Sequence, residues 1–452
     1  MFVRSAAFLP LLAVSLLAAP AIQVSAQDPS AKADTAPVPP DKYLWLEEVH
    51  GARAMTWVKA QDARSAKTLE ADPRFAAYSA DALKVGEDPN RLPLPQLRGD
   101  DIYNFWRDQN NVHGLLRKTS LADFASPAPH WQTVLDIDAL GKKENASWVF
   151  HGMSCLYPGT RYCTIALSAG GEDASTDREF DLKTGQFVDS GFSSPHSKQD
   201  IAWEDKDTLL IAREWGPHTM TASGYPYIVK EWRRGTPLAS AKEVFRGEPT
   251  DIGASGIVLH DAQGDHLTLF GRDVTFFQSR WFVQTPSGLQ EIGIPRKAQP
   301  DGLLENRMLI EIHEDWTPTP GGPKFTQGSL LSVRVADLMR DPAHLHPAVV
   351  FAPTSDEFLN QVATTRSHVI VTTLKHVLGQ AYVYAPSDSA RQDGWTRRAL
   401  DVPSNSTIGI VTSSDSTEAF FLSVTSFLTP SSLLAGDAAT AELTPSKSEP
   451  AL

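Results

Sequence analysis

Runs of strand-forming residues return along most of this chain at a nearly constant interval. From residue 101 onward, short aliphatic or alternating segments are closed by Gly, Pro, Asp and Asn, a pattern typical of β-strands joined by tight turns. Seven such groups, each with three or four strand signals, begin roughly 50 residues apart, near Ile102, Ala146, Asp200, Ile252, Arg307, Phe358 and Thr407. This period favours a seven-bladed β-propeller over two stacked β-sandwiches, which would not explain near-equal spacings.

The propeller is expected to occupy residues 91–436, and the segments on either side of it differ in character. Residues 41–90 predict two or three helices with aromatic faces, since they are rich in Ala and poor in β-branched residues. The chain is therefore expected to be mainly β, with a short helical segment before the propeller. The last group of strands has clear signals only at 408–412 and 419–425, so its other strands are expected from elsewhere, and residues 437–452 are expected to be a disordered tail.

Residues 1–26 have the organisation of a secretory signal peptide. Arg4 provides a positive charge, residues 6–21 form an apolar stretch, and Val24-Ser25-Ala26 resembles a signal-peptidase cleavage site. The alternative is an uncleaved membrane anchor, but the apolar stretch is short, contains proline and is followed by polar residues. We therefore expect an exported protein, periplasmic or extracellular, with no membrane association after cleavage and with residues 27–40 as a disordered N-terminus.

The charge of the chain argues against one class of partner. With 41 Lys and Arg against 54 Asp and Glu, the net charge is −13 at pH 7. Such an acidic protein is unsuited to binding nucleic acid or anionic membrane surfaces. The sequence also contains no glycine-rich phosphate loop, so no cofactor is expected.

Cys155 and Cys163 are the two cysteines of the chain. Between them a Pro158-Gly159 pair predicts a turn, and a loop at residues 158–160 would place the two cysteines opposite each other on a β-hairpin. In an oxidising compartment this arrangement permits a disulfide. The alternative is two small buried hydrophobic side chains on neighbouring strands.

No serine lies in a convincing nucleophile elbow, G-x-S-x-G, in which both flanking positions must be small. The nearest segments surround Ser255, where isoleucine replaces the second glycine, and Ser154, and both are expected to be turns or strand ends. His313 lacks the second histidine of an H-E-x-x-H zinc motif. His344 and His346 lie on one side of an extended segment, but the prolines beside them favour a surface loop over a metal site. We therefore expect neither catalytic nor metal-binding residues in this chain.

Two further features have both a structural and a functional interpretation. The chain contains 11 Trp, many of them beside charged residues. We expect them to pack between blades rather than to line a peptide channel. Residues 261–265 are expected to form a hairpin turn with Gly264 at positive φ, rather than a calcium loop.

Several segments, taken together in their order and spacing, carry a resemblance to a known family. They are residues 43–48 (YLWLEE), 54–58 (AMTWV), 104–108 (NFWRD), 167–174 (LSAGGEDA), 178–182 (REFDL), 187–192 (FVDSGF), 202–205 (AWED), 220–226 (MTASGYP), 232–238 (WRRGTPL) and 427–433 (FLTPSSL). From about residue 41 onward the chain resembles the N-terminal helices and propeller of the prolyl oligopeptidase family of serine peptidases.

The resemblance implies a two-domain architecture and a peptidase function. In that family a seven-bladed propeller caps an α/β-hydrolase domain that carries the catalytic Ser, Asp and His, and the N-terminal helices wrap onto the hydrolase. The propeller restricts access, so the substrates are short peptides. A hydrolase domain needs on the order of 250 residues, whereas this chain ends at Leu452, soon after the last matching segment.

We therefore expect the hydrolase domain to be absent and this chain alone to be inactive, and whether the chain is an enzyme stays open. Short peptides are expected as partners if a hydrolase domain is joined to it. The alternative is a free-standing exported propeller that acts as a binding module without peptidase activity.

Overall fold

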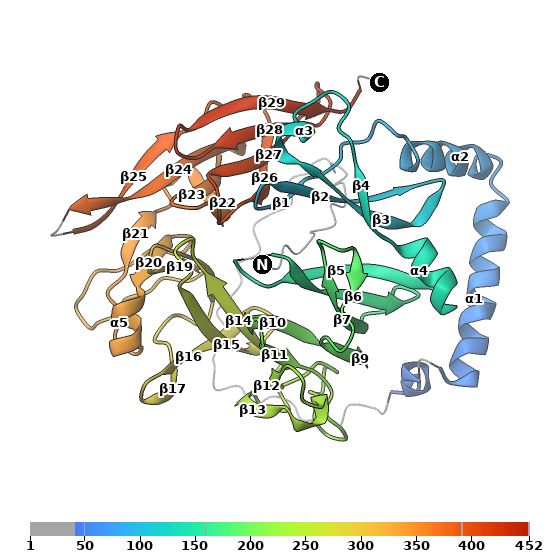
Figure 1. The fold of residues 1–452 in the computed structure, drawn as a ribbon, viewed down its shortest axis with the longest axis horizontal. Coiled ribbons are helices and arrows are strands. Elements are labelled where there is room, and N and C mark those ends of the chain that lie inside the picture. The colour runs from blue at the N-terminus through green and yellow to red at the C-terminus, as the bar shows by residue number, and fades with distance from the viewer. Residues whose placement is uncertain (1–40, 49, 159, 390–391, 451–452) are drawn as a thin grey trace, which may run out of the picture. The chain divides into compact units, whose positions relative to one another are not determined.

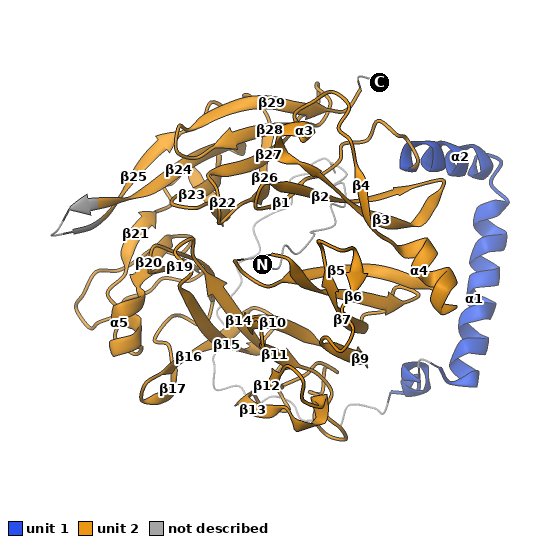
Figure 2. Ribbon diagram, viewed as in Figure 1, with its two compact units in different colours: residues 1–86 blue, residues 87–452 orange. Residues whose placement is uncertain are grey.

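The computed structural model describes residues 41–450, except residues 49, 159 and 390–391. The predicted signal peptide and the predicted disordered segment 27–40 lie outside the described residues. The chain divides into two units, residues 1–86 and 87–452, which are treated separately (Figure 2). Within the described residues, no helix combines the length and the apolar character that a membrane crossing requires.

Helices form the described part of the first unit, as the sequence predicts. They are a 3-10 helix, η1 (Leu44–Glu47), and two α-helices, α1 (Ala52–Glu70) and α2 (Phe75–Gly86). Asp72 lies between α1 and α2 and accepts hydrogen bonds from the backbone and the guanidinium of Arg74 at 2.8 to 3.0 Å. Trp45 of η1 meets Trp57 of α1 edge to face, with ring centroids 6.3 Å apart.

The second unit is a seven-bladed β-propeller, which confirms the predicted fold class (Figure 1). Seven sheets follow one another along the chain, and in each sheet the strands lie in sequence order, except that the last strand of the second sheet pairs with the third strand instead of the fourth. The first four blades contain β1 (Gln96–Arg98), β2 (Asp101–Asp108), β3 (Asn111–Ser120) and β4 (Gln132–Asp136); β5 (Trp148–Cys155), β6 (Tyr162–Ala169), β7 (Ser175–Asp181), β8 (Gln186–Phe187) and β9 (Ser193–Ser197); β10 (Asp200–Asp205), β11 (Thr208–Ala212), β12 (Ile228–Arg233) and β13 (Lys242–Arg246); and β14 (Gly253–His260), β15 (His266–Thr275), β16 (Gln278–Thr285) and β17 (Gly288–Glu291).

The remaining three blades follow the same plan. They contain β18 (Ala298–Leu304), β19 (Arg307–Ile312), β20 (Leu330–Arg334) and β21 (Ala348–Phe351); β22 (Glu357–Thr364), β23 (Val369–Lys375), β24 (Leu378–Ser389) and β25 (Gln392–Ala399); and β26 (Thr407–Ser413), β27 (Ala419–Thr425), β28 (Ser432–Asp437) and β29 (Glu442–Ser448). Short helices lie in the connections between strands: α3 (Leu121–Phe124), α4 (Ile137–Glu144), η2 (Leu238–Ser240) and α5 (Val335–Arg340).

The C-terminal segment differs from its prediction. Instead of a disordered tail at residues 437–452, β28 and β29 pair with each other and complete blade 7. The missing strands of the last blade therefore come from its own C-terminal sequence and not from elsewhere in the chain. The reason is the position of β29 at the outer edge of the blade, where most of its side chains are exposed and Pro445 is tolerated, so its sequence lacks an apolar strand pattern.

The interior strands have continuous aliphatic sequences instead of alternating ones, because both of their faces are buried. All five residues of β11, TLLIA, are buried, because each face of a blade packs against the neighbouring blade. The first strands of neighbouring blades lie next to each other around the propeller axis, while β13, β17 and β25 lie toward the periphery (Figure 1).

The turns of the blades define two faces of the propeller. Neighbouring strands within each blade are antiparallel, so the turn after the first strand and the turn after the second strand lie at opposite ends. First turns of neighbouring blades meet: Asn306 donates to Asp261 and Asp265 at 3.1 and 2.9 Å, and Arg366 N donates to the Thr417 carbonyl at 3.0 Å. We call the end that carries these turns the first-turn face and the other end the second-turn face.

Candidate functional site

A serine, a histidine and a carboxylate meet at the first turn of blade 6, but they cannot act as a catalytic triad. Ser367 Oγ lies 3.1 Å from His368 Nδ1 and donates to Glu418 Oε1 at 2.6 Å. Glu418 Oε2 lies 3.0 Å from the same Nδ1 atom. A triad needs the serine and the acid on opposite ring nitrogens. Burial alone would raise the pKa of Glu418, but hydrogen bonds from His368, Ser367 and Thr365 lower it to about 2. Glu418 of blade 7 is therefore an ionised acceptor that holds the first turn of blade 6.

The residues that the sequence singled out as weak catalytic or metal candidates lie in ordinary structural positions. Ser255 lies inside β14 opposite Gly271, and Ser154 lies inside β5 opposite Thr164. His344 pairs with Asp341 at 3.0 Å in the exposed loop before β21. Within the part of the chain that the structure describes, no three His, Cys, Asp or Glu side chains gather as a metal site would require.

The turn at Asp261 has the form that the sequence predicts. The backbone N–H of Asp261 donates to the Asp265 carbonyl at 3.1 Å, and Gly264 adopts φ +88°, where other residues are strained. Asp261 uses its carboxylate to accept from the backbone of Gln263 and Asp265, which fixes the turn.

Cys155 and Cys163 form the last residue pair of the β5–β6 hairpin, which is the register that the turn signal predicts. The structure joins them in a disulfide. The hairpin is anchored on its own blade by Arg161, whose guanidinium donates to both carboxylate oxygens of Asp181 at 3.0 and 2.6 Å.

Tyr157, at the tip of this hairpin, contacts a blade that is not adjacent to its own. Its ring stacks on His260 of blade 4, with centroids 4.8 Å apart and an interplanar angle of 25°. Burial and the carboxylates of Asp415 and Asp261 raise the pKa of Tyr157 to about 12. Burial and nearby His266 lower the pKa of His260 to about 4. Both rings are therefore uncharged at neutral pH, and the stack is an aromatic contact rather than an ion pair.

A pocket of about 310 Å³ lies beside this stack. Its walls come from the hairpin tip and from the first-turn regions of blades 3 and 4: Leu156, Tyr157, Pro158, Glu204, Asp205, Lys206, His260, Gly264 and His266. No pattern in the sequence indicated this pocket, because Tyr157 and His260 are about one hundred residues apart and neither lies in a motif.

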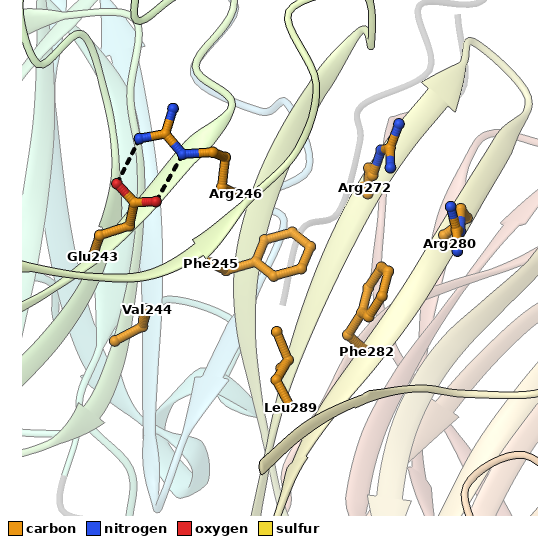
Figure 3. A pocket seen from close by; sticks show the side chains of 8 residues that line it. All are labelled: Glu243, Val244, Phe245, Arg246, Arg272, Arg280, Phe282 and Leu289. Atoms are coloured by element: carbon orange, nitrogen blue, oxygen red, sulfur yellow. Dashed lines mark hydrogen bonds and ion pairs between the residues drawn. The ribbon is translucent and has the colours of Figure 1, made fainter.

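A second pocket, of about 430 Å³, lies between β13 and blade 4 (Figure 3). It is lined by apolar side chains and by three arginines that each pair with a carboxylate: Phe245, Phe282 and Leu289, and the pairs Arg246–Glu243, Arg272–Asp251 and Arg280–Glu291. Because the carboxylates neutralise the guanidinium groups, this pocket is a groove between blades and has no free charge for an anion.

The junction of blades 2 and 3 contains a row of buried acids on β7. Asp177, Glu179 and Asp181 are buried, and alternate residues of a strand share one face. Glu179 accepts a bidentate pair of hydrogen bonds from Arg234 of blade 3 at 2.8 and 3.0 Å. Two tryptophans of blade 3, Trp203 and Trp232, pack edge to face on Phe192 beside this row, which confirms the packing role predicted for such residues.

Asp177 is the exception in this row, because one of its oxygens is unsatisfied. The side chain is 6% exposed, and its Oδ1 atom has no hydrogen-bond partner. Burial and the Asp200 carboxylate raise the pKa of Asp177 to about 7, although Ser175 and Arg213 oppose the shift. Burial also raises the pKa of Asp200 to about 6.

These two acids predict a pH dependence of stability. A folded-state pKa above the unfolded value stabilises the fold at low pH, and that contribution is lost as the pH rises through the folded pKa. We expect the free energy of unfolding to fall by about 1.4 kcal/mol per pH unit for each group, between pH 4 and pH 7 for Asp177 and between pH 4 and pH 6 for Asp200. Asp177→Asn should flatten this fall, measured by urea denaturation at several pH values, while Asp189→Asn, an exposed control, should not. An unchanged slope in Asp177→Asn would contradict the assignment.

The family described as "Prolyl oligopeptidase, N-terminal beta-propeller domain" matches residues 24–449. The chain belongs to the prolyl oligopeptidase family. The match extends through β29, in agreement with the seventh blade.

Relatives of this prolyl oligopeptidase-family chain are longer than the chain itself. It is 34% identical over 418 residues to the uncharacterised peptidase y4nA of Sinorhizobium fredii, covering 91% of this chain and 57% of that protein. It is 26% identical over 409 residues to the uncharacterised peptidase RP174 of Rickettsia prowazekii, covering 86% and 55%. The chain thus spans a little over half the length of these relatives.

Solved structures show the same fold. A post-proline cleaving enzyme from Rickettsia typhi matches with a TM-score of 0.82 at 23% identity, over 90% of this chain and 60% of that one. Oligopeptidase B from Leishmania major matches with a TM-score of 0.65 at 12% identity, over 90% and 56%. These two matches show a shared fold over the propeller.

Proposed function

We propose that this chain is the substrate-gating propeller portion of an exported prolyl-oligopeptidase-type serine peptidase that hydrolyses short peptides, and that the chain alone does not hydrolyse them. Family membership supports this proposal, as do the two relatives named as peptidases. The structural neighbour from Rickettsia typhi is named as a post-proline cleaving enzyme, so bonds after proline are the first substrates to test.

The observation that carries the proposal is the apolar character of the second-turn face. Large hydrophobic side chains are exposed at the second turns of four blades, namely Val112, Phe276, Phe277, Val377, Phe427 and Leu428. Exposed apolar side chains that recur on one face are typical of a surface that another protein domain covers. A propeller that acts alone would not need them. We propose that a hydrolase domain covers this face.

The described helices of the first unit add a second surface of the same kind. Leu69, Phe75 and Tyr78 are exposed on α1 and α2. This surface also fits a domain that carries the catalytic residues, and it is the reason to prefer a peptidase portion over a free-standing binding module.

Activity assays test the proposal directly. The purified chain is expected to show no turnover of a proline-containing chromogenic peptide. A chimera, in which the part of the Sinorhizobium fredii relative beyond the match follows Leu452, is expected to cleave the short peptide but not a folded protein. Clear turnover by the chain alone would contradict its predicted inactivity.

Surface variants identify the face that is used. Phe276→Ser combined with Phe277→Ser should lower turnover by the chimera, because these side chains lie on the second-turn face. Gln263→Ser, at an exposed position on the first-turn face, serves as the matched control and should leave turnover unchanged. Equal turnover in all three chimeras, or tight peptide binding by the chain alone, would favour the binding-module alternative.

A further inference from the structure

The groove between β13 and blade 4 differs in chemistry from one end to the other. Three arginines lie toward one end and Leu289 lies at the other, with the rings of Phe245 and Phe282 between them (Figure 3). Its volume of about 430 Å³ is in the range of cavities that bind small ligands. The apolar end can therefore accept a side chain, and the arginine end can accept polar groups of the same ligand.

The guanidinium groups at the arginine end offer donors without net charge. Each of the three arginines binds a carboxylate through Nε and Nη2, as Arg246 does to Glu243 with two bonds of 2.7 Å. A guanidinium has five N–H donors, so this geometry leaves the N–H groups of Nη1 to other acceptors. Arg272 Nη1 lies 3.9 Å from Glu248, which is longer than a hydrogen bond. Because the carboxylates balance the charges, the acceptor that suits this end is neutral, such as a peptide carbonyl.

Strand β13 adds backbone groups to the same groove. It is the last strand of blade 3, so one of its edges has no neighbouring strand among the described residues. Its pairing with β12 is interrupted at Val244, the extra residue of a β-bulge, and such a residue is left out of the ladder. Residues 243–246 of β13 line the groove. An extended peptide in the groove could therefore pair with this edge, as peptides do at other exposed sheet edges.

The edge of β13 suits a short segment rather than a long strand. The bulge and the charged side chains of Lys242, Glu243 and Arg246 oppose pairing over a greater length. A partner domain would need an interface of about 1,000 Å² or more, which a five-residue strand does not provide. A free peptide of about three residues, roughly 10 Å long when extended, fits this edge. Such a ligand also matches the short peptides of the proposed function.

We propose that this groove is a peptide-binding site at the periphery of the propeller, and that it takes an uncharged, extended peptide with one apolar side chain. The side chain packs on Phe282 and Leu289, and the peptide carbonyls accept from Nη1 of the arginines. The proposal goes beyond the proposed function, because the site consists of this chain alone and needs no hydrolase domain. With a few hydrogen bonds and one buried side chain, the expected Kd is about 1 mM, far weaker than the tight binding typical of a binding module.

Binding of a neutral tripeptide to the chain alone tests the site. The probe is N-acetyl-Ala-Leu-Ala-amide, and ligand-observed NMR measures its Kd. Leu289→Asn should weaken binding about fivefold, because it makes the apolar end polar. Arg246→Gln should weaken it about tenfold, because it removes a charged donor. Two matched controls should bind like the wild type: Leu378→Asn, at an equally exposed leucine of β24, and Arg233→Gln, at an exposed arginine of β12 that pairs with Glu231.

Four results would overturn the proposal. The first is no binding of the tripeptide to the wild-type chain at about ten times the expected Kd. Equal affinity in Leu289→Asn, Arg246→Gln and the two controls would place the peptide elsewhere. Inorganic phosphate that competes with the tripeptide would indicate a site for anions. Loss of tripeptide binding in the chimera would show that the joined domain, and not a free peptide, occupies the groove.

Failure of this site differs from failure of the proposed function. Binding is measured on the chain alone, whereas peptidase activity is measured on the chimera. If the chimera cleaves nothing, that result counts against the proposed function, and the Kd values of the variants still decide the groove. If the chimera cleaves the short peptide but the wild-type chain binds no tripeptide, the proposed function holds and the groove is not a peptide site.

Discussion

Replacement of Arg234 by alanine is expected to lower the free energy of unfolding of the propeller by about 3–5 kcal/mol. Arg234 holds the carboxylate of Glu179 with two hydrogen bonds across the junction of blades 2 and 3. The side chain of Glu179 is only 1% exposed, so removal of the guanidinium leaves a buried charge without its counterion. The backbone N–H of Phe192, at 2.8 Å, would be its main remaining donor.

The neighbouring arginine provides the matched control. Arg233 pairs with Glu231 at 2.8 Å, but its side chain is 67% exposed, and surface ion pairs contribute little to stability. Urea denaturation followed by circular dichroism should therefore show a large loss for Arg234→Ala and almost none for Arg233→Ala. Equal losses would mean that burial of the pair does not determine its contribution.

A double variant distinguishes the effect of losing the ion pair from the effect of losing side-chain volume. Glu179→Leu combined with Arg234→Met removes both charges and keeps side-chain volume at the junction. Since a buried ion pair replaced by apolar side chains is often nearly neutral, this variant should be more stable than Arg234→Ala. A double variant as unstable as the single one would point to packing, not charge, as the cause.

This pair also explains part of the resemblance to the family. Glu179 lies in the segment REFDL and Arg234 lies in the segment WRRGTPL, two of the segments that carry the resemblance. The sequence placed them in separate blades, and the structure shows that they pair across one junction. We infer that these segments record how blades are joined.

Several features of the fold were predictable because they depend on local patterns. The strand period predicted seven blades, and the turn at Pro158 predicted the register of Cys155 and Cys163. The predicted starts of blades 1 and 5 fall on the second strands, β2 and β19. Their first strands are poor signals: β1 has three residues, and β18 contains Pro, Asp and Gly.

The features that could not be predicted depend on distant parts of the chain. The stack of Tyr157 on His260 joins blades 2 and 4, and the strand period of the sequence does not indicate contacts between distant blades. The burial of Asp177 is different, because the sequence of residues 175–181 is polar except at Phe180. Such a run is typical of a solvent-exposed segment, and only the structure shows that Asp177, Glu179 and Asp181 are buried.

Phe421→Ala is expected to destabilise the propeller by about 3–5 kcal/mol and to do so at one place, the closure of the ring. In the described part of the chain, every blade is built from strands that are contiguous in sequence, so blades 1 and 7 share no strand. Side chains close the ring instead. Phe421 of blade 7 meets Phe124 edge to face, with ring centroids 5.5 Å apart. Two hydrogen bonds accompany this contact in the described residues, from Leu97 N to Thr412 Oγ1 at 3.0 Å and from Lys447 Nζ to the carbonyl of Ser126.

Hydrogen exchange can locate the effect. Loss of Phe421 should raise exchange in β1–β3 and β26–β28, while β10–β19 keep their protection, because the junctions of the middle blades are untouched. Phe180→Ala removes an equally buried ring from the cluster of blades 1 and 2 and should raise exchange there instead. A uniform rise over all blades in Phe421→Ala would mean that the ring unfolds as one unit. A rise confined to the first and last blades would show that this junction, which no shared strand closes, is where the propeller opens first.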